Sequence, residues 1–128
     1  MITHPASGLP ATRIETRKPD NWHNHFPCPD DPWFDAMVAY VARQFRRASA
    51  MSTASMPVVT AERMVAYRDA IRASAEKSGF PEFEPLMVGM MTPDTTARMI
   101  DDLFDAGAYG IEIVPANGFP DYRARTFR

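Results

Sequence analysis

Short runs of apolar residues along this chain alternate with segments in which apolar residues recur every three or four positions. The helical spacing predicts three amphipathic helices, and the runs of strand length predict four strands. The expected helices are residues 31–45, 60–78 and 94–106. The expected strands are residues 22–26, 48–51, 86–91 and 109–114.

Capping residues mark the ends of these expected helices. Asp31 with Pro32 behind it is a typical helix start, and Thr60 is a second one. Gly79 and Gly107 suit the position just after a helix, where a left-handed backbone conformation is common. The third helix is expected to turn its apolar face inward, and that face carries Met99, Ile100, Leu103 and Phe104.

The order strand, helix, strand, helix, strand, helix, strand is typical of right-handed βαβ units on a parallel sheet. One candidate is a doubly wound sheet, but neither GxGxxG nor GxxxxGK[ST] follows the first strand. The other is a TIM-type barrel, which needs about 250 residues. The sequence therefore predicts an α/β fold, a partial TIM-type (β/α) barrel of about four parallel strands with three intervening helices.

Composition limits the function classes. The 128 residues are 45% hydrophobic and 23% charged, which fits one globular domain or a piece of one. Fourteen basic against sixteen acidic residues give a net charge of −2, so we expect no nucleic-acid partner. No apolar run approaches the roughly 20 residues of a membrane span, and no targeting signal is evident. The single cysteine, Cys28, favours a cytoplasmic location.

The candidate chemistry lies in the tetrapeptide Trp22-His23-Asn24-His25. Residues two apart in a strand share a face, so His23 and His25 can present two imidazoles to one metal ion. The other reading is that both are surface or hydrogen-bonded histidines, because the HxH pattern is short. Placement at the C-terminal end of a barrel strand favours the metal site.

Five segments together resemble the dihydroorotases, a family of the metal-dependent amidohydrolase superfamily. They keep the family's order and approximate spacing across residues 17–118, which we interpret as a dihydroorotase-like half-barrel, the N-terminal half only. Residues 1–16 are then an irregular lead-in and residues 119–128 a divergent or disordered tail. The segments are residues 17–26 (RKPDNWHNHF), 47–51 together with 56–60, 65–71, 83–87 and 111–117 (IEIVPAN).

The resemblance implies zinc-dependent interconversion of carbamoyl-aspartate and dihydroorotate in pyrimidine biosynthesis. His23 and His25 match the first two metal ligands of the family. The family's metal-bridging carbamylated lysine corresponds to Glu112, whose carboxylate is itself an oxygen donor. Glu112 is thus the third expected ligand, or else a solvent-paired acid that has drifted from that role.

The substrate-reading positions depart from the family. Its substrate-holding arginine corresponds to Pro27, and its asparagine to Thr53, which together with Asn117 remains a substrate-binding candidate. The later metal ligands and the base aspartate have no counterpart, so no catalytic residue is assigned. We expect a truncated chain that is inactive alone, and whether it is an enzyme stays open.

Three functions therefore remain open. The first is a dihydroorotase-like zinc amidohydrolase by descent. The second is a metal-dependent hydrolase of a different cyclic amide or ester. The third is a non-catalytic interaction protein. An open half-barrel leaves two sheet edges uncovered, so we expect a homo-oligomer or a partner protein that covers them.

Overall fold

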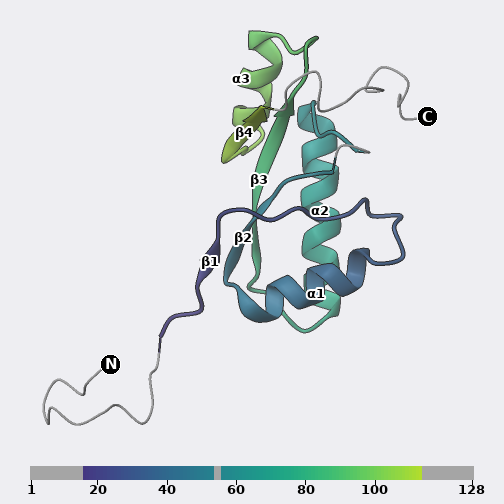
Figure 1. Ribbon diagram of the computed structural model, residues 1–128, viewed down its shortest axis with the longest axis vertical. Helices are drawn as coiled ribbons and strands as arrows, with labels where there is room; N and C mark the ends of the chain where they lie inside the picture. Colours follow the sequence, from purple (N-terminus) through teal and green to yellow (C-terminus); the bar gives the residue numbers. More distant parts are fainter. Residues whose placement is uncertain (1–15, 54–55, 114–128) are drawn as a thin grey trace, which may run out of the picture.

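A computed structural model describes residues 16–53 and 56–113 of the chain. Within these ranges the chain forms four strands and three helices in strict alternation (Figure 1). The predicted lead-in, apart from Thr16, and the predicted tail lie outside the described residues. In chain order the elements are β1 (Asp20–Asn21), α1 (Phe34–Gln44), β2 (Arg47–Ala50), α2 (Ala61–Lys77), β3 (Glu84–Met91), α3 (Ala97–Asp105) and β4 (Gly110–Ile113).

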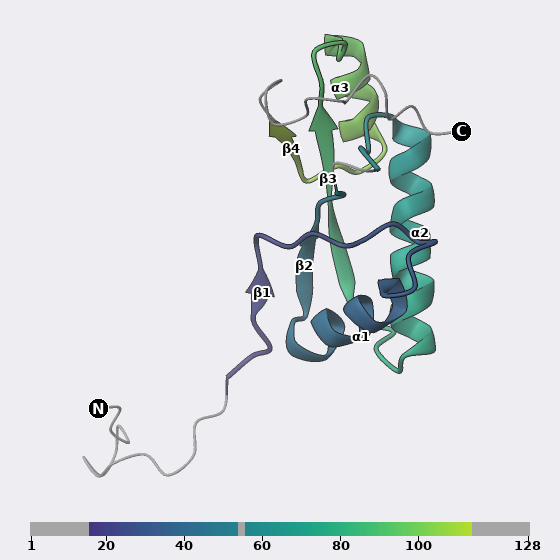
Figure 2. The ribbon, with the colours of Figure 1, turned by 45° about the vertical axis from the view of Figure 1, so that its right-hand side comes forward.

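The strands form one parallel sheet in the order β1-β2-β3-β4. Consecutive parallel strands joined by helices are βαβ units, and the sheet they build curls into a half-barrel. Helices α1 and α2 cover one face of the sheet, and β1 and β4 lie away from α2 (Figure 2). The predicted α/β partial barrel is confirmed.

The core lies between the sheet and the helices. Ala48 and Ala50 of β2 are fully buried, and their small side chains let the helices approach the sheet closely. A Cβ atom added at Gly89 in β3 would lie 2.8 Å from Leu103 Cδ1 and 2.9 Å from Ile111 Cδ1, so only glycine fits without a shift. The helices contribute to this core Phe34, Val38, Val41, Ala42, Met64, Tyr67, Ile71, Ala75 and Leu103.

Most predicted helix ends are confirmed. The Thr60 hydroxyl accepts a hydrogen bond from the backbone N–H of Arg63, and Gly79 and Gly107 have φ of +86° and +96°. Asp31 as N-cap was wrong. Its carboxylate accepts from the backbone N–H of Trp33 at 2.8 Å, which closes a turn ahead of the helix, so α1 begins only at Phe34.

Phe104 was also predicted to face inward, and this was wrong. Its side chain is 49% exposed, whereas Leu103 beside it is fully buried. Leu103 packs over Gly89 of β3, beside Ile111 of the last strand β4, so only a narrow stripe of this helix is covered. None of the described helices is long and apolar enough to span a bilayer.

The first strand is displaced from its predicted position at residues 22–26. β1 ends at Asn21, because the side-chain oxygen of Asn21 accepts a hydrogen bond from the backbone N–H of His23 at 3.1 Å and bends the chain. Pairing resumes as one bridge between His25 and Met51, where Phe26 N donates to the Met51 carbonyl at 3.0 Å. The two histidines thus lie beyond a bend and not in a regular strand.

Candidate metal centre

The segment that carries the histidines is fixed to the C-terminal end of β2. The backbone N–H of Asn24 donates to the buried Ser49 hydroxyl at 2.8 Å. The backbone N–H of Met51 donates to the Asn24 carbonyl at 3.1 Å. These bonds replace the missing strand pairing and tie the backbone of the histidine segment to the end of β2.

His25 is oriented by a single hydrogen bond to the backbone. Its Nδ1 lies 3.1 Å from the Ser52 carbonyl oxygen, which only accepts, so Nδ1 carries the hydrogen and donates. In the neutral ring this leaves the lone pair on Nε2, which lies 4.0 Å from Glu112 Oε1. Histidine ligands of metals are held in this way, with one ring nitrogen on a carbonyl and the other on the metal.

Glu112 reaches this place from the opposite edge of the sheet. It pairs in register with Met90 of β3, and its neighbour Ile111 packs against the core on the helix side. Because side chains alternate along a strand, Glu112 faces the inner side of the half-barrel. The side chains of His25 and Glu112 are 39% and 25% exposed, so solvent reaches both.

His23 lies beside His25. The two imidazole rings meet edge to face, with centroids 5.4 Å apart and an interplanar angle of 73°. The two-residue spacing predicts this proximity for a regular strand. In the structure the two rings come together beyond the bend that follows Asn21. His23 is exposed and remains a candidate ligand by prediction.

These side chains fit part of a zinc site. Imidazole nitrogen and carboxylate oxygen are both zinc donors, and two ligands of a tetrahedral zinc lie about 3.3 Å apart. The 4.0 Å between His25 Nε2 and Glu112 Oε1 is close to that separation. Over residues 16–53 and 56–113, however, the structure holds no group of three or more His, Cys, Asp or Glu side chains placed to bind a metal.

Known proteins with similar sequences are dihydroorotases. That of Erythrobacter litoralis is 38% identical over 108 residues, covering 81% of this chain and 29% of the relative. That of Shewanella frigidimarina is 38% identical over 105 residues, covering 82% and 29%. No family model matches the chain.

A solved structure shares the fold. The crystal structure of dihydroorotase from Campylobacter jejuni superposes with a TM-score of 0.63 at 23% identity, covering 77% of this chain and 28% of that one. The chain is homologous to part of the dihydroorotases. It spans less than a third of the length of these curated relatives.

Of the positions that the resemblance predicts to bind substrate, Pro27 and Thr53 lie within the described residues. The Pro27 carbonyl lies 3.3 Å from the Tyr67 hydroxyl, and Thr53 is half-buried at the end of the segment that follows β2. The Thr53 carbonyl accepts a hydrogen bond from Met56 N at 2.9 Å. Asn117, the other substrate-binding candidate, lies outside the described residues.

Sequence reasoning missed two polar residues that support this region. The Tyr67 hydroxyl donates to the Phe26 carbonyl at 2.8 Å, and burial raises the pKa of Tyr67 far above its ordinary value. The Ser52 hydroxyl accepts from Val58 N at 3.1 Å and is almost fully buried. The signal in the sequence was the hydroxyl of a tyrosine within an amphipathic helix, because a buried tyrosine hydroxyl needs a hydrogen-bond partner.

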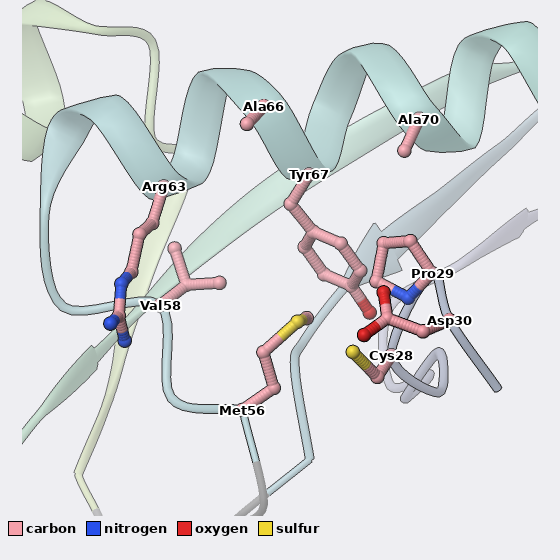
Figure 3. Close-up of a pocket in the computed structure, with 9 residues that line it drawn as sticks. All are labelled: Cys28, Pro29, Asp30, Met56, Val58, Arg63, Ala66, Tyr67 and Ala70. Atoms are coloured by element: carbon pink, nitrogen blue, oxygen red, sulfur yellow. The ribbon is translucent and has the colours of Figure 1, made fainter. Parts of the chain in front are cut away.

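A cavity of about 430 Å³ lies between the segments after β1 and β2 and the helix α2 (Figure 3). Its middle is apolar, with Arg63 toward one end and Asp30 toward the other. The lining residues are Cys28, Pro29, Asp30, Met56, Val58, Arg63, Ala66, Tyr67 and Ala70.

Proposed function

We propose that this chain is the metal-binding part of a dihydroorotase-like zinc amidohydrolase, which hydrolyses a cyclic amide. One observation carries the proposal: the hydrogen bond from His25 Nδ1 to the Ser52 carbonyl leaves Nε2 directed at Glu112. Homology to part of the dihydroorotases supports it. Their reaction, the interconversion of carbamoyl-aspartate and dihydroorotate, is the first candidate activity.

The proposed ligands are His23, His25 and Glu112. A bound zinc ion would polarise a substrate carbonyl and lower the pKa of a bound water molecule. Glu112 would supply its carboxylate directly, where the family's lysine must first be carbamylated. The Ser52 carbonyl holds the His25 ring in the orientation that ligation requires.

The substrate of this site need not be dihydroorotate. Pro27 offers no side-chain donor for a substrate carboxylate, and Thr53 offers a hydroxyl in place of an amide. A different cyclic amide or ester is therefore the alternative substrate. We place the protein in the cytoplasm, as its single cysteine favours.

Turnover requires more than these three side chains. A hydrolase of this kind needs a base that takes a proton from the attacking water, and no residue of the described chain is assigned to that role. We propose that a second copy or another protein covers the edges β1 and β4 and completes the site. The chain by itself is then expected to bind zinc and to leave dihydroorotate unchanged.

Calorimetric titration of zinc into the metal-free full chain tests the proposal. We expect binding near one zinc per chain, weakened at least about ten-fold in Glu112→Gln, because even indirect metal partners contribute ten- to a hundred-fold to affinity. Glu82→Gln is the matched control, since Glu82 is exposed in a loop of the described chain. Equal affinity of wild type and Glu112→Gln, or no binding to the folded chain, would contradict the proposal.

A non-catalytic interaction protein is the second candidate. It is favoured by three exposed side chains, Trp33, Met37 and Tyr40, spaced three and four residues apart along α1 and its N-cap. Aromatic residues and methionine are enriched in protein interfaces. This candidate predicts that a His23→Ala/His25→Ala double variant keeps its biological role unchanged.

A further inference from the structure

Two side-chain contacts join the segment that follows β1 to the region of β4, although these two strands are not neighbours in the sheet. β1 and β4 are the two edges of the order β1-β2-β3-β4. The Trp22 and Tyr109 rings nevertheless lie with centroids 5.7 Å apart and planes at 36°, and His25 meets Glu112 at 4.0 Å. The curl of the sheet carries both edges to the side away from α2, which allows these contacts (Figure 2).

The two contacts follow the same spacing on both edges. Trp22 precedes His25 by three residues, and Tyr109 precedes Glu112 by three residues. On each edge the aromatic residue therefore precedes the histidine or the glutamate by the same short stretch of chain. On the β1 side these three residues span the bend that follows Asn21, and on the β4 side they lead directly into the strand, so each ring lies close along the chain to one member of the histidine–glutamate contact.

Each ring is backed by a fixed group. The Arg47 guanidinium lies 5.9 Å from the Trp22 ring centroid, and Arg47 donates twice to Asp20 Oδ2, at 3.1 and 2.6 Å. Tyr109 is held by its backbone N–H, which donates to the Met87 carbonyl of β3 at 2.7 Å. The aromatic contact consequently connects the residue after β1 with the residue before β4, and each of the two has a further contact with the neighbouring strand.

Because both rings are largely exposed, a role in positioning can be tested separately from a role in stability. Trp22 is 58% and Tyr109 is 59% exposed, so truncating either removes little buried apolar surface. We propose that Trp22 and Tyr109 form a clamp that sets the distance between His25 and Glu112. Both are positioning residues, and the inference rests on the proposed function.

The experiment uses the full chain with Trp33→Phe, which leaves Trp22 as its sole tryptophan. Into it are placed Tyr109→Ala, the conservative Tyr109→Phe, and Tyr40→Ala as a control at another exposed tyrosine. We expect Tyr109→Ala to shift Trp22 emission and to weaken zinc binding about ten-fold, the range of indirect metal partners. Tyr109→Phe keeps the ring and should restore the affinity to within about two-fold, and Tyr40→Ala should change neither quantity.

The outcomes are distinguishable. Unchanged Trp22 emission in Tyr109→Ala would show that the rings do not meet, which overturns the clamp whatever zinc does. A shifted emission with unchanged zinc affinity would show contact without positioning and also overturns it. If the parent chain is folded but binds no zinc, the proposed function fails and the clamp's role fails with it, while the emission still reports the contact. Circular dichroism confirms that each variant is folded.

Discussion

The interior of this molecule and its two sheet edges are held together in different ways. β2, β3, α1 and α2 bury a continuous apolar core. β1 has only two residues, and β4 has no buried side chain. The candidate metal ligands nevertheless come from the edge regions. The core holds the buried apolar surface, whereas the two edges meet through contacts between partly exposed side chains.

The connection between the two regions lies at the end of β2. Ser49 and Ser52 are buried, and the Ser49 hydroxyl and the Ser52 carbonyl hold Asn24 and His25. The edge segment is thus positioned by polar groups of the interior. Substitutions in the core and at the sheet edges therefore test the difference between these two regions.

The largest expected effect is that of Ile71→Ala in α2. Ile71 is fully buried, so the change should lower the free energy of unfolding by about 2–5 kcal/mol through lost burial and a cavity. The same change at Ile113 in β4, which is 73% exposed, should cost less than about 0.5 kcal/mol. Urea unfolding followed by circular dichroism measures both. Similar losses at the two positions would show that the edge is packed as firmly as the core.

Tyr67→Phe should have an intermediate effect. It removes the hydroxyl that donates to the Phe26 carbonyl, and an unpaired buried carbonyl costs about 1–3 kcal/mol. Tyr40→Phe is the control, because Tyr40 is exposed. The same unfolding experiment applies, and an equal loss in both variants would exclude a special role of the Tyr67 hydroxyl.

Tyr67 also predicts a dependence on alkaline pH. Its pKa is raised by burial, so its contribution to stability is complete below the ordinary value of 10.0 and is lost as pH rises above it. Tyr67→Phe should remove that part of the alkaline loss. A wild-type and variant pair that lose stability in parallel above pH 10.0 would contradict this assignment.

The smallest expected effect is that of Asp20→Asn at the base of the clamp. Hydrogen bonds from Arg47 lower the pKa of Asp20, so its contribution is present above the ordinary value of 3.8 and is lost as pH falls through the lowered value. The unfolding midpoint of the variant should therefore change less than that of wild type on acidification below 3.8.

Asp35→Asn gives the comparison at an exposed carboxylate of helix α1. The pKa of Asp35 is lowered first by its hydrogen bond from Lys77 and then by that from Ser74, so the acid response has the same direction. Only Asp20→Asn should also alter Trp22 emission, because Asp20 anchors the Arg47 guanidinium beside that ring. An emission change in Asp35→Asn would show that the two regions are not independent.

Much of the fold follows from local sequence patterns. The apolar spacing of α2, its Thr60 cap and Gly79 determine that helix with little help from elsewhere. The strand at residues 22–26 was misplaced because the bend depends on an Asn21 side chain that bonds its own backbone. Phe104 was misplaced because its exposure depends on what flanks β4, which helical periodicity does not contain.

For the candidate site, sequence reasoning named a set of residues, which stays a prediction, and not their geometry. His23, His25 and Glu112 were found from their spacing and from a resemblance. The hydrogen bond from His25 to Ser52 and the contact of Trp22 with Tyr109 join residues 27 and 87 positions apart. Such contacts arise from the curl of the sheet, which no local pattern specifies.

The most direct test of the central claim is zinc X-ray absorption spectroscopy of the loaded chain. The account predicts nitrogen and oxygen ligands at about 2.0–2.1 Å with imidazole scattering, and a loss of that bound population in Glu112→Gln. A sulfur shell at about 2.3 Å would place the metal on Cys28 or elsewhere, and would contradict a site built from His25 and Glu112.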